Sequence, residues 1–266
     1  MPVPEDKLRL GGMALRNGLL VHGPSHWAVA IRADDGSVKV ASGPKPRVTE
    51  FDGIPGLRGL VRLAESFAVI PLVKKGLPQA KLAFENPSVI GVAAAASLTG
   101  TAIKRRVKGT PGELASALVG LTPAIFALRG GELAAYHGVE HKAIAAYEAD
   151  DEDARDATKE HERCGSHLMA PMIAANVVGA LLLKRAMEKP TPLAGGIVSL
   201  AATAAAVEVF AWSERHIESP VSKALKKPGY ELQRAIGTRE PDERQLEVGR
   251  AALAEILRVE EKADSN

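Results

Sequence analysis

Cysteine and aromatic residues are scarce in this sequence, and its charges nearly balance. The 266 residues include one cysteine, Cys164, so no disulfide forms within the chain, and a reducing or membrane-facing setting is favoured over a disulfide-rich secreted one. Aromatic residues make up 4% of the chain, too few for a surface that stacks nucleic-acid bases. The formal net charge is +2 and the basic residues are scattered. We therefore expect no nucleic-acid partner.

Strongly apolar runs are also lacking. From Asn86 onward come four weakly apolar stretches, each of about the length that crosses a bilayer core, roughly 17 to 25 residues, or slightly shorter. They read NPSVIGVAAAASLTGTAI, LASALVGLTPAIFAL, LMAPMIAANVVGALLL and PLAGGIVSLAATAAAVEVFAW. Their hydropathy leaves two readings open, membrane spans or buried helices of a soluble all-α domain, because Leu, Ile, Phe and Val supply most of the insertion free energy. Their small residues suit close packing between transmembrane helices.

The start of the chain and the basic loops indicate how the chain would be oriented across a membrane. The opening MPVPEDKLRL lacks the basic start and apolar core of a secretory signal peptide, so we expect the N-terminus to lie in the cytoplasm. With the N-terminus inside, the loops KRRVK and KRAMEK would both lie outside, which the positive-inside rule disfavours. A re-entrant or interfacial pair of helices would remove that conflict, so the number of spans stays open.

The two ends of the chain read differently from its middle. HWAVAIRADDGSVKVAS alternates apolar and polar residues on both sides of Asp34-Asp35-Gly36, which predicts a β-hairpin. PDERQLEVGRAALAEIL predicts a helix with an apolar side. These patterns divide the chain into a β-hairpin region at 1–50, a helical membrane region at 51–220 that includes a motif loop at 129–167, and a soluble helical segment at 221–266.

One helical motif carries residues of metal chemistry. In a helix, His137 and His141 lie one turn apart on one face, with Glu140 on nearly the same side. H-x-x-E-H is a pattern in which two histidines hold zinc while the glutamate polarises the attacking water. Glu148, farther along this face, is the right residue type for a third ligand or for a carboxylate that orients an imidazole. The alternative is a polar helix face that binds no metal.

A second cluster follows an acidic linker that is long enough to bring it to the first. His161, Cys164 and His167 are each three residues apart, and thiolate and imidazole both suit zinc. Cys164 is otherwise a small buried hydrophobe before an apolar helix. Within the fourth apolar stretch, Glu208 would be a functional carboxylate in a membrane and part of a polar face in a soluble helix.

Several separated motifs, in order, resemble the YqhQ-like bacterial family (DUF1385). They are GGMALRNGLLVHGPSHWAVAIR, YHGVEHKAIAAYE, HERCGS and REPDERQLEVGRAALAEIL, and they span about Arg9 to Leu257. The resemblance implies a multi-pass membrane protein of uncharacterised function, in a family of which some members are labelled predicted metal-dependent enzymes. It also implies that the Ala-rich stretches are membrane spans.

The sequence departs from the family pattern at a few positions. Glu162 stands where the family usually has proline, and His167 is outside the pattern, so we leave it out of the expected ligands. Met13 and Asn17 stand where the family has glutamine and glutamate, which raises the question of whether the site is altered here.

These observations predict a mainly α, multi-helix integral membrane protein with a small N-terminal β-hairpin region and a soluble C-terminal helix. We expect it in the cell membrane, in contact with the lipid bilayer. The predicted site is a divalent metal, zinc, held by His137, His141 and His161, completed by Cys164 or Glu148. Glu140 would be the general base of a hydrolase acting on an unidentified substrate at the membrane face.

Two alternatives remain open. In the first, the metal is structural and the chain is a membrane scaffold that binds other membrane proteins. In the second, the helices form a transport path with Glu208 as its carboxylate.

Overall fold

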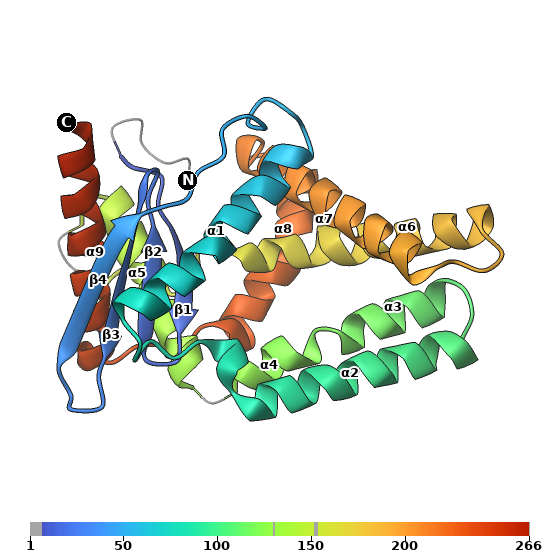
Figure 1. Ribbon diagram of the computed structural model, residues 1–266, viewed down its shortest axis with the longest axis horizontal. Coiled ribbons are helices and arrows are strands. Elements are labelled where there is room, and N and C mark those ends of the chain that lie inside the picture. The colour runs from blue at the N-terminus through green and yellow to red at the C-terminus, as the bar shows by residue number, and fades with distance from the viewer. Residues whose placement is uncertain (1–6, 130, 152–153, 266) are drawn as a thin grey trace.

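The computed structural model describes residues 7–129, 131–151 and 154–265, with an antiparallel sheet of strand order β1-β2-β3-β4 and helices around and beyond it (Figure 1). The strands are β1 (Gly11–Leu15), β2 (Gly18–His22), β3 (His26–Arg32) and β4 (Val38–Pro44). The helices are α1 (Leu57–Gly76), α2 (Pro87–Arg106), α3 (Thr110–Val119), α4 (Thr122–Leu128), α5 (Glu132–Glu148), α6 (Met169–Ala186), α7 (Pro192–Arg215), α8 (Pro220–Leu232) and α9 (Glu243–Asp264), with short helical turns at η1 (Ala83–Glu85), η2 (Gly165–Leu168) and η3 (Gln233–Gly237). Residues 1–6 lie outside the described residues. They are part of the N-terminal stretch from which a cytoplasmic N-terminus is expected.

The sheet is built from consecutive hairpins. The predicted hairpin is confirmed as β3–β4, where Gly36 has a φ of 82°, a left-handed conformation that glycine adopts at little cost. The β1–β2 hairpin, in which Leu15 pairs with Gly18, has no counterpart in the sequence analysis. All five residues of β2 are buried, so this strand lacks the apolar and polar alternation by which a half-exposed strand is recognised.

Helices cover both faces of the sheet. Leu19 and Val21 belong to a core formed with α5 and α9, which includes Ile256. Leu20 points the other way, into a core formed with α1 that includes Val69. The separation follows from the strand itself, because successive side chains point to opposite faces. The sheet is therefore the middle layer of a compact unit, and α5 lies against it.

The predicted C-terminal helix is confirmed as α9. Its N-terminus is fixed by a capping box, in which the Asp242 carboxylate accepts the Gln245 N–H at 2.9 Å and the Gln245 side chain accepts the Asp242 N–H at 2.9 Å. Because α9 packs on β2 and β3, residues from the 1–50 and 221–266 segments share one core.

Two helical hairpins extend from this unit and lie beside one another, one made of α2 with α3 and α4, the other of α6 with α7 (Figure 1). In the described part of the chain, three segments are long and apolar enough to cross a membrane: Thr110–Leu128, Gly165–Ala186 and Pro192–Arg215. They correspond to three of the four apolar stretches of the sequence, whereas the first stretch forms α2 and is not one of the three. The predicted fold class is confirmed in its helical content, its candidate spans and its N-terminal sheet.

The hairpins expose large apolar side chains. Leu98, Leu193 and Ile197 are 73%, 74% and 62% exposed. Contiguous apolar surface of this kind is covered by a membrane or by a partner. The hairpins thus have the surface that a lipid environment requires.

Candidate metal centre

Helix α5 positions the histidines and the glutamate of the H-x-x-E-H motif, as their spacing predicts. It is buried along most of its length between the sheet, α9 and the turn η3. The rings of His137 and His141 lie with centroids 4.4 Å apart on one side of the helix. The polar residues of this motif therefore face the protein interior and not solvent.

Backbone carbonyl groups fix the orientation of both imidazoles. Nδ1 of His137 lies 2.7 Å from the Gly237 carbonyl oxygen, and Nδ1 of His141 lies 2.6 Å from that of Lys159. A carbonyl oxygen accepts only, so each Nδ1 carries the proton and each Nε2 keeps a free lone pair. This is the arrangement by which protein carbonyls orient metal-binding histidines. Burial also lowers the pKa of His141, which favours the neutral ring.

Cys164 completes a three-residue cluster. It precedes η2, and its Sγ lies 3.4 Å from Nε2 of His137. One ligand atom from each of His137, His141 and Cys164 falls within 4.8 Å of the other two. Nε2 of His141 is buried and has no hydrogen-bond partner among the described residues. A buried lone pair without a donor is costly unless something binds it, and a metal ion at this cluster would do so.

His161 and Glu148 lie beside the cluster and pair with each other. The His161 ring centroid is 5.6 Å from that of His141, but its Nε2 lies 3.7 Å from Oε2 of Glu148. Glu148 also accepts a 2.9 Å hydrogen bond from Arg163. Burial would raise the pKa of Glu148, but hydrogen bonds from His161 and Arg163 outweigh it and lower this pKa to about 2. Their part as metal ligands stays a prediction.

Glu140 is buried against the first strand. A Cβ atom at Gly12 would lie 2.6 Å from the Glu140 carboxyl carbon, so only glycine leaves room for the carboxylate there. Burial raises the pKa of Glu140. A carboxylate whose pKa is raised toward neutrality is suited to accept a proton.

A second glycine brings the C-terminal region onto α5. A Cβ atom at Gly138 would lie 2.3 Å from the Arg239 carbonyl oxygen, so this contact requires glycine. The close approach places the Gly237 carbonyl on His137 and lets the Arg239 N–H bind the Ala134 carbonyl at 2.9 Å. The glycine of the motif therefore serves the geometry of its histidine.

Lys142 organises the loop opposite. Its buried ammonium donates to the carbonyls of Arg155 and Ala157 at 2.8 and 2.7 Å and pairs with Glu240 at 2.7 Å. The loop held in this way carries Lys159, whose carbonyl orients His141.

A cavity of about 250 Å³ opens onto the cluster. Its polar side chains include Glu140, His141, His161, Arg163 and Cys164. Arg9, Phe210 and Glu214 also line it, and the sequence analysis did not select them because they come from segments distant in the chain. The cavity gives water and a small reacting group access to the cluster.

Two departures from the family pattern, Met13 and Asn17, lie away from this cavity. Met13 packs against the core on the α1 side of the sheet, since it neighbours Gly12 on the strand and points to the other face. Asn17 binds the backbone of Arg32, Gln79 and Lys81 and so joins two loops. Neither residue changes the lining of the cavity. His167, excluded from the expected ligands, is buried; its Nδ1 donates to the Lys226 carbonyl oxygen at 2.9 Å, and its Nε2 accepts from the Gln233 side-chain amide at 3.2 Å.

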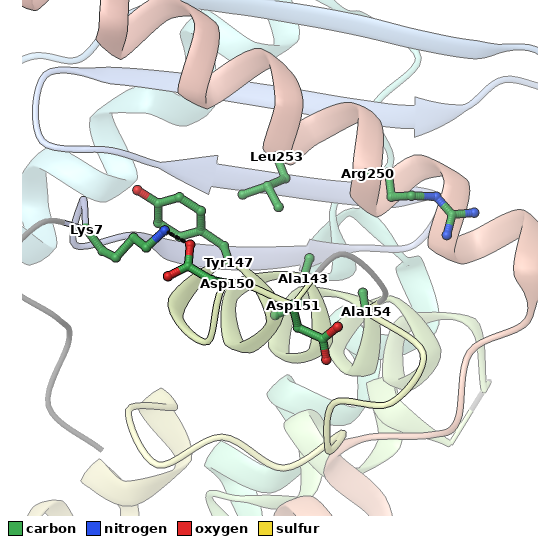
Figure 2. A pocket seen from close by; sticks show the side chains of 9 residues that line it. Lys7, Ala143, Tyr147, Asp150, Asp151, Ala154, Arg250 and Leu253 are labelled. Atoms are coloured by element: carbon green, nitrogen blue, oxygen red, sulfur yellow. Dashed lines mark hydrogen bonds and ion pairs between the residues drawn. The ribbon is translucent and has the colours of Figure 1, made fainter.

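A different pocket, of about 410 Å³, lies between α5 and α9 (Figure 2). Lys7 and Asp150 form an ion pair there, and Lys7 lies 5.1 Å from the centre of the Tyr147 ring. The Tyr147 hydroxyl accepts the Leu8 N–H at 2.9 Å. These contacts hold the segment that continues into Arg9 and Gly12, two residues that line the 250 Å³ cavity.

Glu208 is engaged in an ion pair near the C-terminal half of α7. It accepts hydrogen bonds of 2.9 Å from Nε of Arg58 and from the Gly56 N–H. The carboxylate therefore joins α7 to the start of α1.

Comparison with known proteins confirms the resemblance stated from the motifs. Residues 131–259 match the family described as "Protein of unknown function (DUF1385)". The chain is 25% identical to the protein described as "Uncharacterized protein YqhQ" of Bacillus subtilis (strain 168), over 96% of this chain and 94% of that protein. No solved structure matches the chain. The matched family segment contains the whole cluster.

Proposed function

We propose that this chain is a multi-pass protein of the cell membrane that binds zinc at His137, His141 and Cys164 and hydrolyses its substrate at the membrane face. The observation that carries the proposal is the buried, unpartnered Nε2 of His141 beside the His137 and Cys164 ligand atoms. Two imidazoles and a thiolate suit zinc and argue against the oxygen-liganded ions magnesium and calcium.

The ligand number supports catalysis over a purely structural metal. Catalytic zinc sites use three protein ligands and leave a position open, whereas structural sites close with four. Here three ligand atoms converge, and the 250 Å³ cavity lies beside them. His161 lines that cavity, and Glu148, which pairs with His161, accepts a hydrogen bond from Arg163, another lining residue.

The chemistry divides between the metal and the chain. When bound, zinc supplies Lewis-acid chemistry, which polarises the scissile bond and acidifies water. Glu140 accepts the proton of the attacking water and returns it to the leaving group, so that water adds across one ester-type bond. Arg163, held by Glu148, offers guanidinium N–H groups to developing negative charge.

Metal content tests the site directly. We expect about one zinc per chain in detergent-purified protein prepared without chelator, measured by inductively coupled plasma mass spectrometry. His137→Ala/His141→Ala should lose it, while His216→Ala, which changes a histidine at the exposed end of α7, should keep it. A wild-type protein free of zinc would contradict the proposal.

The proposed orientation places the N-terminus and the metal centre on the cytoplasmic side. The hairpin ends then carry their basic loops to the other side, where Glu113 pairs with Lys184 at 2.5 Å and Lys104 at 3.3 Å and neutralises part of that charge. A single cysteine at Ser37, in a Cys164→Ala background, should escape a membrane-impermeant maleimide in intact cells. Labelling there would reverse the orientation.

A further inference from the structure

The metal centre lies between two larger cavities of opposite character. A basic cavity of about 690 Å³ shares Arg9, Arg163 and Glu214 with the metal-centre cavity. An apolar cavity of about 810 Å³ shares Gly165 with it. Arg163 therefore borders the basic cavity and the metal-centre cavity, and Gly165 borders the apolar cavity and the metal-centre cavity. Cys164 lies between them in the chain.

The basic cavity has an excess of cationic side chains. Its six basic residues are Arg9, Arg58, Arg62, Arg163, Arg215 and Lys226. Its three acidic residues are Asp52, Glu162 and Glu214. Within the described ranges neither Arg215 nor Lys226 has a carboxylate oxygen within 4.0 Å, and their charges act at longer range on Glu208 and Glu162. Both cations therefore have N–H groups that a ligand can bind.

The paired arginines are oriented as well as charged. Arg9 is held by Glu214 at 2.6 Å, and Arg58 is held by Glu208 at 2.9 Å. A guanidinium that gives some of its N–H groups to a carboxylate presents the others in a fixed direction. Several oriented guanidinium groups suit a phosphate, which carries more than one negative charge and three acceptor oxygens.

The apolar cavity lies between the two helical hairpins. Helix α6 contributes more of its lining than any other element, and α3 and α7 close it; all three belong to the segments able to cross a membrane. The ion-paired Lys104, Glu113 and Lys184 also line it. Its apolar lining includes Leu168, Met169, Met172, Ile173, Val177 and Leu183. Its volume is in the range of pockets that enclose a ligand of several tens of atoms. Hydrocarbon chains are the ligands that such a space between spans would take.

We propose that the substrate of the metal centre is a membrane lipid whose headgroup carries a phosphate. The phosphate lies in the basic cavity, the hydrocarbon chain lies between α3 and α6, and the linkage that joins them lies at the metal-centre cavity. This inference rests on the proposed function for the reaction, but not for the binding. The order of the cavities is the order of the parts in an anionic lipid.

Native mass spectrometry of the detergent-purified full chain tests binding and zinc in one spectrum. The probes are phosphatidic acid, a diacylglycerol with the same acyl chains, and glycerol 3-phosphate. We expect one phosphatidic acid per chain, bound at least roughly 10-fold more tightly than either of the other two, because each lacks the partner of one cavity. Equal binding of phosphatidic acid and diacylglycerol would overturn the proposal, as would glycerol 3-phosphate binding as tightly as the lipid.

Paired variants assign the two halves of the ligand. Arg215→Gln/Lys226→Gln should weaken phosphatidic acid binding roughly 10-fold or more, whereas Lys223→Gln, on α8 outside the cavity, should not. Ala180→Trp fills the apolar cavity and should exclude the lipid, whereas Leu181→Trp, on α6 but outside the lining of this cavity, should not. Phosphatidic acid binding that both cavity variants leave unchanged would overturn the proposal even if the wild type binds it.

The same spectra separate this inference from the proposed function. His137→Ala/His141→Ala should lose zinc and still bind phosphatidic acid, since the headgroup is held by the basic cavity. If the wild type selects phosphatidic acid but contains no zinc, the lipid site is supported and the zinc hydrolase is overturned. If it contains zinc but shows no lipid selectivity, the zinc site is supported and the lipid substrate is overturned.

Discussion

Helix α5 buries charged and polar side chains, whereas the two helical hairpins expose large apolar ones. On α5, Glu140, His141 and Lys142 are 8%, 2% and 3% exposed, although charged and polar side chains are seldom buried without partners. On the hairpins, Leu98 and Leu193 are more than 70% exposed. The first pattern indicates a site that uses its polar groups, and the second indicates a surface that something other than water covers.

The largest effect expected concerns the chemistry of α5. Glu140→Gln keeps the size of the side chain and removes its ability to accept a proton. Turnover should fall by about 10²- to 10⁴-fold while zinc content stays at the wild-type value. The measurement is hydrolysis of chromogenic phosphate esters and carboxylic esters alongside metal analysis. If the variant kept the zinc and the wild-type rate, the metal would be structural and the scaffold reading would replace the hydrolase.

The second prediction addresses the hairpins. Ile197→Asp places a charge on an exposed part of α7 and should cost up to about 2.5 to 3.5 kcal/mol of insertion free energy, the value for a helix centre, if lipid covers this face. The fraction of protein recovered in washed membranes should drop. Val40→Asp is the matched control, since Val40 is 41% exposed on β4 of the sheet, where water is the expected neighbour. Equal tolerance of both changes would mean that the hairpins lie in water or against a polar partner.

A third prediction concerns pH and a buried histidine of the sheet. Burial, reinforced by the charge of Lys45, lowers the pKa of His22 to about 4, and both ring nitrogens lack a hydrogen-bond partner in the described part of the chain. An unfolded histidine has a pKa near 6.5, so protonation favours the unfolded state. The stability that His22 contributes is complete above pH 6.5 and is lost as the pH falls through 4.

This loss should amount to about 3 kcal/mol for the full shift. The free energy of unfolding, followed by the fluorescence of the sheet residue Trp27 and of Trp212, should fall less between pH 7 and pH 4.5 in His22→Leu than in the wild type. The acidic residues contribute to both proteins, so the difference isolates His22. Identical pH profiles would show that the ring is not held neutral.

The smallest effect is a pair of glycine substitutions. Gly12→Ala would place a Cβ atom 2.6 Å from the Glu140 carboxyl carbon, whereas the same change at Gly11 meets nothing within 4 Å. Gly12→Ala should therefore cost about 1 to 3 kcal/mol of stability and reduce turnover, and Gly11→Ala should do neither. Thermal unfolding of the two variants, one residue apart, is the measurement. Matching unfolding temperatures would mean that Glu140 has room to move.

Spacing within one helix predicted the part of the site that lies on α5. His137, Glu140 and His141 share a face because of the helical period, and Cys164 was selected because its residue type suits zinc. Glu148 was identified by its residue type as a ligand or as a carboxylate that orients an imidazole, but which imidazole it meets was not predictable, since that depends on how the segment after α5 folds back onto the helix. The roles of Gly12 and Gly138 could not be predicted from the sequence either, because each depends on a close approach between segments distant in the chain.

The fold was predictable to a similar degree. Alternation of apolar and polar residues around Asp35 and Gly36 predicted the β3–β4 hairpin. Strand β2 is buried on both faces, so its sequence lacks the alternation by which a strand is recognised. Ala-rich composition blurred the distinction between buried and lipid-facing helices in the hairpins, and only the three-dimensional arrangement shows which of their faces lack a protein neighbour.

The packing of α9 on β2 and β3 has a consequence for the order of assembly. Both hairpins lie between the sheet and α9 in the chain, and segments near the N-terminus are synthesised first. Leu19 and Val21 therefore lack their α9 neighbours until both hairpins have been synthesised, and α9 closes this core afterwards. The core that α9 completes therefore closes after both hairpins have been made, although His137, His141 and Cys164 all precede Glu243 in the chain.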